Sequence, residues 1–288
     1  MRQRPETVRA GDRKLGPRPV LMGIVNVTPD SFSDGGEAFS PERAAERALQ
    51  LLDEGAHVID VGGESTRPGA EPVSEEEEIR RVVPAVRAIL AERPRAVVSV
   101  DTYRAGTAEV ALDAGALMVN DITALRGDPR MARLVAEAGC GVVLMHMRGT
   151  PETMQRDPRY EDVVGEVRDF LARRAEAAVA AGVDPGRILL DPGIGFGKTV
   201  EHNLRLLGSL DVIAEIGFPV LVGTSRKAFI GRITGAEDPK ERVFGTVATS
   251  VIAYGRGAFA FRVHDVRANR EALEVAAAVE ALPLRELS

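Results

Sequence analysis

The chain has 288 residues, 44% of them hydrophobic, and a formal net charge of −6 at pH 7. This length allows one large domain or two small ones, and no apolar run reaches the roughly 18 residues that a membrane-spanning helix needs. A protein that binds nucleic acid would be expected to show a basic face, which this acidic balance does not suggest. We therefore expect partners that are neither nucleic acid nor membrane.

Cysteine use and the first residues indicate a compartment. The single cysteine, Cys140, cannot form an internal disulfide and is typical of a reducing environment. The first 18 residues are rich in arginine, but the apolar segment of a secretory signal does not follow them. We therefore expect a cytoplasmic protein.

Strands and helices are predicted to alternate after an irregular lead-in over residues 1–18, in which a short strand is an open alternative. Eight short runs rich in β-branched residues read as strands, at residues 20–27, 57–61, 97–100, 117–119, 141–145, 188–190, 219–223 and 258–263. Each run is continuously apolar, as expected for parallel strands that are covered on both faces.

Segments with helical spacing separate these strands. Ser40-Pro41 and Asp128-Pro129 predict an N-cap followed by proline at the first helical position, and Ser74 with Glu77 predicts a capping box. The helix after Ser74 carries an apolar stripe through Ile79, Val82, Val83, Val86 and Leu90. Glycines precede the strands where a helix end turns into the next strand, at Gly55, Gly115, Gly139, Gly182, Gly217 and Gly257.

Eight alternations without a break in composition predict an α/β protein with a single (β/α)8 TIM barrel in residues 19–288. A doubly wound sheet is the alternative. In that fold, polar residues would gather at one switch point, whereas here they end all eight strands. The barrel is therefore favoured.

The active site of such a barrel lies at the C-terminal ends of its strands, and one group of polar residues there suits a heterocycle. Asp101, Asn120 and Asp191 offer acceptors and an amide, which match a fused amino-pyrimidine with several N–H donors. Each residue alone could instead be a helix cap or a turn former. The glycines between Asp191 and Lys198 predict a binding turn that a ligand approaches closely, although Asp191 could cap the helix near Thr199.

A second group predicts an anionic half of the site. Lys227, Arg262 and His264 lie after the last two predicted strands, in the loops that often hold phosphate in this fold. A surface cluster paired with helix carboxylates is the alternative. The segment 197–199 resembles the end of a nucleotide P-loop, but the glycine spacing of that motif is not met.

Two long glycine-rich loops, at 28–36 and 62–69, follow the first two strands. They predict mobile lids that exclude water from bound substrates, with ordinary surface loops as the alternative.

Five segments resemble the signature segments of bacterial dihydropteroate synthases, in the order of that family. They are NVTPDSFSDG at 26–35, DVGGESTRPG at 60–69, DPGIGFGK at 191–198, SRK at 225–227 and RVHD at 262–265. The resemblance implies an enzyme that joins p-aminobenzoate to 6-hydroxymethyl-7,8-dihydropterin pyrophosphate and releases pyrophosphate. It also implies Mg²⁺ as cofactor and a homodimer.

The resemblance assigns roles by position in these motifs. Pterin binding is implied for Asp101, Asn120, Met145, Asp191 and Lys227. Pyrophosphate binding is implied for Asn26, Thr66, Arg67, Arg262 and His264, with the metal at Asn26. Binding of p-aminobenzoate is implied for Phe32, Pro68, Phe196 and Lys227. Asp101, Lys227 and Arg262 are the implied catalytic residues, because a carboxylate and a cationic cluster can stabilise the charges that develop as the C–O bond breaks.

Two other functions stay open as alternatives. A methyltetrahydrofolate methyltransferase-type barrel would have no use for the anionic half, and a non-catalytic pterin-binding paralogue would have no use for the lids. One departure from the family is Ala228, where many members have a serine close to the aminobenzoate carboxylate. His57 and His202 are interpreted as structural.

Overall fold

Eight parallel strands surround a common axis in the computed structural model, which describes residues 6–17, 19–28, 40–65 and 72–281. The strands are β3 (Val20–Asn26), β4 (Val58–Gly62), β5 (Val97–Asp101), β6 (Met118–Asp121), β7 (Gly141–Met145), β8 (Ile188–Asp191), β9 (Leu221–Val222) and β10 (Ala260–Val263). They are hydrogen-bonded in the order β8-β7-β6-β5-β4-β3-β10-β9. A bridge between Leu190 and Val220 joins the two ends of this order. The predicted (β/α)8 barrel is confirmed, and the open doubly wound sheet is excluded.

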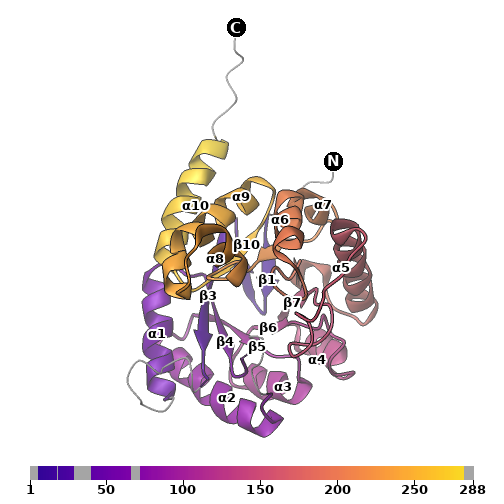
Figure 1. Cartoon of the computed structure of the whole chain (residues 1–288). Coiled ribbons are helices and arrows are strands. Elements are labelled where there is room, and N and C mark those ends of the chain that lie inside the picture. Colours follow the sequence, from indigo (N-terminus) through magenta and orange to yellow (C-terminus); the bar gives the residue numbers. More distant parts are fainter. Residues whose placement is uncertain (1–5, 18, 29–39, 66–71, 282–288) are drawn as a thin grey trace.

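Helices follow the strands and cover the outside of the barrel (Figure 1). They are α1 (Pro41–Asp53), α2 (Glu75–Glu92), α3 (Ala105–Asp113), α4 (Met131–Ala138), α5 (Val163–Ala180), α6 (Val200–Gly208), α7 (Leu210–Ala214), α8 (Ala228–Thr234), α9 (Val243–Gly255) and α10 (Val266–Ala281). The six glycines predicted before strands all have positive φ, between +57° and +107°. Within the described ranges, no helix is long and apolar enough to cross a membrane.

The lead-in is more ordered than predicted, because residues 8–15 form an antiparallel hairpin. Strands β1 (Val8–Ala10) and β2 (Arg13–Leu15) pair around a two-residue loop that begins with Gly11 at φ +55°. Three-residue strands are too short for the alternation signal on which a strand prediction rests. The Gly-Asp pair between them was the available sign of a hairpin.

This hairpin closes the N-terminal end of the barrel. Val8, Ala10 and Leu15 belong to one buried cluster with the inward-facing residues near the strand starts, including Val20 and Met22. A second and larger cluster fills the space between strands and helices. The barrel interior is therefore apolar at its N-terminal end, which leaves the opposite end for polar groups.

Of the three predicted helix starts, the one at Ser40 is confirmed, and the ones at Asp128 and Ser74 differ in detail. Ser40 caps α1 as expected, because its Oγ accepts from the Arg43 amide. By contrast, α4 begins only at Met131, and the Asp128 carboxylate accepts from the Arg130 amide in the preceding turn and from the first amide of α3.

The capping box at the start of α2 forms only by half. Ser74 accepts from the Glu77 amide at 3.2 Å, but the Glu77 carboxylate pairs with Arg80 at 2.7 Å and Arg81 at 2.6 Å. Two nearby guanidinium groups compete with the single backbone amide that a capping box offers, and charge-assisted bonds are the stronger ones.

Candidate active site

At the mouth of the barrel, three predicted site residues lie together with Asp60, to which no site role was assigned. Arg262 on β10 donates from Nε to Asp60 Oδ2 on β4 at 2.6 Å, and from Nη2 to Asp101 Oδ2 on β5 at 2.7 Å. Asn120 on β6 donates from Nδ2 to the same Asp60 oxygen at 3.0 Å. The mouth of the barrel thus holds two carboxylates, an amide and a guanidinium in one connected network.

The charges in this network shape one another. Burial raises the pKa of Asp101 to about 7, and the charge of Arg262 opposes that rise. Burial acts to lower the pKa of Arg262, but the neighbouring Asp60 and Asp101 outweigh it and raise the pKa above its ordinary value. Arg262 therefore stays charged, and Asp101 can change its charge near neutral pH.

A second polar group joins β8 to the turn before α8. Asp191 is buried, and its Oδ1 accepts from the Gly193 amide at 2.7 Å. Lys227 donates from Nζ to the Ile194 carbonyl and lies 4.7 Å from the centre of the Phe196 ring. Burial lowers the pKa of Lys227 to about 8, while Asp191 opposes that change. Burial also raises the pKa of Asp191, and Lys227 opposes it.

Thr199, rather than Asp191, caps α6. The Thr199 side chain accepts from the His202 amide, and the His202 ring accepts from the Thr199 amide. His57 accepts from the Leu21 amide through Nδ1 at 3.0 Å. Both histidines therefore make the structural contacts that were predicted, and Asp191 is left for the site.

Close packing against the β7 loop explains part of the glycine turn that follows Asp191. Gly193 has φ +65°, and a Cβ built there would lie 1.9 Å from the His146 carbonyl oxygen. Lys198 is only 3% exposed, and its Nζ lies 3.0 Å from both His146 Nδ1 and the Phe196 carbonyl oxygen. Lys198 thus ties the β8 loop to the β7 loop instead of facing a ligand, a role that the sequence did not reveal.

An apolar cluster lies beside these polar groups. It contains Ile122, Met145, Met147 and Met154, with Tyr103 and Phe196 packed against it. Met145 and Phe196, predicted for the pterin and for p-aminobenzoate, are therefore in the same cluster. A cavity of about 510 Å³ adjoins it on the α5 side and is lined by residues that include His146, Met147, Tyr160 and Phe170.

Three of the predicted phosphate-binding residues, Asn26, Arg262 and His264, lie around the ends of β3 and β10. Asn26 is the last residue of β3 and pairs in register with Gly62. His264 Nδ1 lies 3.0 Å from Ser225 Oγ. Arg226, which has φ +58°, is held by two bonds to Asp265 at 2.5 and 2.9 Å. Within residues 225–227, Lys227 is thus the basic residue directed at the site.

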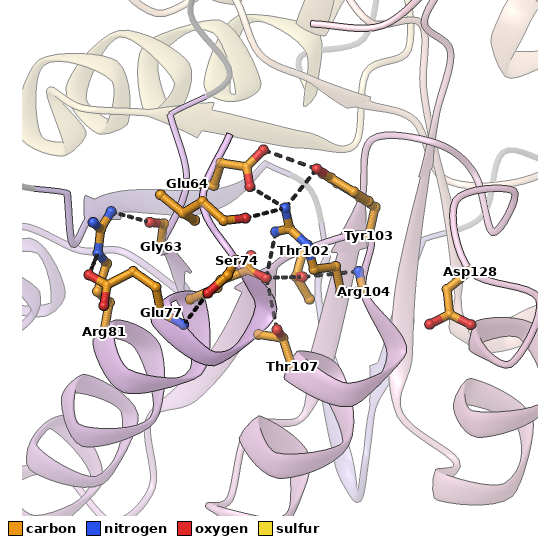
Figure 2. Close-up of polar contacts among 12 residues, drawn as sticks. Gly63, Glu64, Ser74, Glu77, Arg81, Thr102, Tyr103, Arg104, Thr107 and Asp128 are labelled. Carbon is orange, nitrogen blue, oxygen red and sulfur yellow. Dashed lines mark hydrogen bonds and ion pairs between the residues drawn. The ribbon is translucent and has the colours of Figure 1, made fainter. Parts of the chain in front are cut away.

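Phe32, Thr66, Arg67 and Pro68 lie outside the described residues. The chain on both sides of residues 66–71 is held by Arg104, whose Nη2 donates to Glu64 Oε2 at 2.6 Å and to the Val73 carbonyl at 2.8 Å. Figure 2 shows the guanidinium directed at the Glu64 carboxylate, with the Tyr103 hydroxyl beside it.

The same arginine reaches a buried acid on α2. Arg104 Nη1 donates to Glu78 Oε2 at 2.9 Å, and Thr102 and Thr107 donate to that oxygen as well. Glu78 is only 1% exposed, whereas Ile79, predicted for the apolar stripe, is partly exposed. The predicted stripe did not include Glu78, because burial of this acid depends on a distant partner, Arg104, which follows the end of β5.

Comparison with known proteins agrees with this architecture. The family described as "Pterin binding enzyme" matches residues 22–264. A dihydropteroate synthase of Synechocystis sp. is 48% identical over 264 residues, covering 92% of this chain and 91% of the relative.

Solved structures are equally similar. The Xanthomonas albilineans dihydropteroate synthase with 4-aminobenzoic acid has a TM-score of 0.91 and 48% identity, covering 96% of this chain and 99% of that one. The Yersinia pestis dihydropteroate synthase with a sulfonamide drug has a TM-score of 0.90 and 44% identity, covering 96% and 100%. This chain therefore belongs to the dihydropteroate synthase family of pterin-binding transferases.

Proposed function

We propose that this enzyme joins p-aminobenzoate to 6-hydroxymethyl-7,8-dihydropterin pyrophosphate, giving 7,8-dihydropteroate and pyrophosphate. One observation carries the proposal: a buried end with carboxylates and an amide adjoins a cationic end at one barrel mouth, with Arg262 in contact with two of the carboxylates. A relative of the same fold, from X. albilineans, holds 4-aminobenzoic acid.

Roles for individual residues follow from this arrangement and from the family motifs. We propose that Asp101, Asn120, Met145, Asp191 and Lys227 hold the pterin. Asn26, Thr66, Arg67, Arg262 and His264 would hold the pyrophosphate, and Phe32, Pro68, Phe196 and Lys227 would line the aminobenzoate site. The close contact between Lys227 and both the Phe196 ring and the Ile194 carbonyl supports its place between two substrates.

The reaction separates charge. The bond between the pterin methylene and the pyrophosphate oxygen breaks, and its electron pair leaves with the pyrophosphate. The amine of p-aminobenzoate then attacks the cationic methylene and loses one proton. The Asp101 carboxylate stabilises the developing cation, while the charges of Arg262 and Lys227 stabilise the negative charge of the leaving pyrophosphate. Apolar side chains around Met145 limit the access of water that would capture the cation.

Mg²⁺ is proposed as the cofactor, held by the Asn26 amide oxygen together with oxygens of the substrate. Among residues 6–17, 19–28, 40–65 and 72–281, His, Cys, Asp and Glu form no group of three that could hold a metal ion. This fits Mg²⁺, which commonly takes few protein ligands and keeps water and phosphate oxygens. Bound there, it would neutralise charge on the leaving pyrophosphate.

We also propose a homodimer that forms through α9 and α10. Phe244, Ala248 and Ile252 follow one another at four-residue spacing on the exposed side of α9, and Phe244 is 88% exposed. Val275 and Val279 expose a similar stripe on α10. Two neighbouring apolar stripes of this kind are typical of a protein–protein contact.

The test is pyrophosphate release by the purified enzyme with dihydropterin pyrophosphate and Mg²⁺, with and without p-aminobenzoate. We expect release that depends on both substrates, with an equal amount of dihydropteroate. Saturable pterin binding without release would instead indicate a non-catalytic paralogue, and methyl transfer from methyltetrahydrofolate would indicate the methyltransferase type.

One substitution tests the site itself. Lys227→Ala should abolish most of the activity, because it removes the ammonium group beside Asp191 and Phe196. Lys14→Ala is the matched control, since Lys14 is exposed on the hairpin at the other end of the barrel. Full activity of Lys227→Ala would contradict the assigned role.

A further inference from the structure

Asp60 is a charge buried inside an apolar strand. It lies in the middle of β4 and is 0% exposed. Its Oδ2 accepts two hydrogen bonds, from Arg262 Nε at 2.6 Å and from Asn120 Nδ2 at 3.0 Å. Its Oδ1 has no hydrogen-bond partner among the described residues. Asp60 therefore connects two of the proposed ligand-binding side chains through one oxygen atom.

We infer that Asp60 is a positioning residue that fixes the orientation of Asn120 and Arg262 for binding of the pterin. This inference rests on the proposed function, because it assumes that those two residues face the substrate. Asp60 is too deeply buried to meet the ligand, so it acts through the side chains that it holds.

Asp60 determines which end of the Asn120 amide is presented to the ligand. An amide has a donor end and an acceptor end, and an ionised carboxylate can only accept. The Asn120 nitrogen must therefore face Asp60, which turns the amide oxygen away from the carboxylate. That oxygen is the atom suited to receive an N–H of the pterin. A flipped amide would set two acceptors against each other and offer the ligand a donor instead.

Asp60 also fixes the plane of the Arg262 guanidinium. Asp60 takes the Nε–H and Asp101 takes one Nη2–H, so two carboxylates hold two nitrogens of a rigid planar group. These two bonds restrict rotation of the guanidinium and set the direction of its remaining donors. With Asp60 removed, only Asp101 would hold it, and the side chain would gain freedom to rotate.

Three variants separate hydrogen bonding from charge. Asp60→Asn removes the charge but keeps an oxygen for both bonds, because only one oxygen of Asp60 is used. Asp60→Ala removes both. Ser99→Ala is the matched control: Ser99 is the register partner of Asp60 on β5, is equally buried, and its hydroxyl group has no hydrogen-bond partner in the part of the chain that the structure describes.

The affinity of each variant for 7,8-dihydropteroate is measured by calorimetry, without turnover. We expect Asp60→Ala to weaken binding by about tenfold or more, because a bond to a charged group is lost. Asp60→Asn should weaken it by about threefold, and Ser99→Ala should stay within about twofold of the unmodified enzyme. Unchanged affinity in Asp60→Ala would overturn the inference.

An exchange of the Asp60 and Asn120 side chains distinguishes an effect on the orientation of Asn120 from an effect on general stability. Asn120→Asp alone sets two carboxylates against each other and should weaken binding strongly. Adding Asp60→Asn removes this repulsion and restores a donor facing an acceptor, but the new nitrogen cannot accept from Arg262 Nε as Asp60 Oδ2 does. We expect the double variant to regain only part of the lost affinity, about threefold, because the Asn120 contact is restored and the Arg262 contact is not, and residues that share a bond are not additive. No regain would overturn the inference, and this arm does not depend on whether Asp60→Ala folds.

The unmodified enzyme distinguishes the two proposals. If it does not bind dihydropteroate, the proposed function fails. If it binds, and the exchange shows no regain, then the role of Asp60 alone fails.

Discussion

At the scale of single residues, the mouth of the barrel holds groups whose charges change near neutral pH. Burial raises the pKa of Asp101 to about 7 and lowers that of Lys227 to about 8. The reaction needs Asp101 as a carboxylate and Lys227 as an ammonium ion. Both forms coexist best between these two values, although the groups interact and titrate as a set.

We expect kcat/KM to follow a bell-shaped pH profile with its maximum between pH 7 and 8. Activity should rise as Asp101 loses its proton near pH 7, and fall as Lys227 loses its proton near pH 8. The residual activity of Lys227→Arg should have its alkaline limb at a higher pH, because arginine stays charged. An alkaline limb that is unchanged in this variant would assign it to another group, and Lys14→Arg is the control.

Ala228 offers a test of the aminobenzoate side. It is the exposed first residue of α8, directly after Lys227. Ala228→Ser adds one hydroxyl group without filling any packed space, so stability should change by less than about 0.5 kcal/mol. We expect the KM for p-aminobenzoate to fall by a few fold, with the KM for the pterin substrate unchanged. Equal changes in both KM values would contradict a local effect on the aminobenzoate carboxylate.

The residues that the sequence predicted and those that it missed differ in a physical way. Asp101 and Asp191 end their strands and Asn120 is the last residue but one of β6, so local pattern alone brings them to the mouth. Asp60 lies inside a strand, and its partner Arg262 is 202 residues away. Local pattern shows that each buried charge needs a counter-ion, but it does not say which residue supplies it.

At the scale of elements, Arg104 joins the ends of β4 and β5 to the start of α2. It binds Glu64, the Val73 carbonyl and Glu78 together. Burial raises the pKa of Glu78, and its hydrogen bonds with Thr107 and Arg104 oppose that rise. The guanidinium therefore opposes protonation of a buried carboxylate at this junction.

We expect Arg104→Met to lower the free energy of unfolding by about 3 kcal/mol at pH 8, because it leaves Glu78 buried without its cation. The folded-state pKa of Glu78 already lies above its ordinary value and should rise further. Protonation then relieves the loss as the pH falls, so the loss at pH 5 should be smaller. Urea unfolding at both pH values measures this.

Arg80→Met is the control for that comparison, because Arg80 is an exposed residue on the same helix paired with Glu77. It should change stability little at either pH. An equal loss for Arg104→Met at pH 5 and pH 8 would show that packing, rather than the charge of Glu78, accounts for the effect.

At the scale of the whole molecule, the alternation of strands and helices was enough to predict the barrel. The closure of the ring could be predicted because it depends on eight repeated units, which the sequence pattern shows directly. The strand order and the bridge between Leu190 and Val220 confirm it. A short strand was an open alternative in the lead-in, but its pairing into a hairpin was missed, because Val8, Ala10 and Leu15 are buried against the barrel strands. Short elements that depend on tertiary contacts carry little local signal.

The exposed stripe on α9 and α10 makes the assembly testable. Phe244→Glu places a charge on the most exposed of its large apolar residues. We expect this variant to shift the enzyme from dimer to monomer in analytical ultracentrifugation, while its circular dichroism stays unchanged. Val179→Glu is the matched control, because Val179 is also exposed and apolar but lies on α5, away from α10 (Figure 1). A dimer that persists in Phe244→Glu would place the contact elsewhere.

The hairpin at the base of the barrel sets an order of events during synthesis. The Gly11 carbonyl accepts a hydrogen bond from Arg187, 176 residues later in the chain. At the usual pace of translation, about 10 to 35 s pass between the two residues leaving the ribosome's catalytic centre. Val8, Ala10 and Leu15 cannot reach their full set of neighbours within that time, because their cluster includes Leu189 and Phe259. A segment that is made well before its partners is therefore among the last to reach its place.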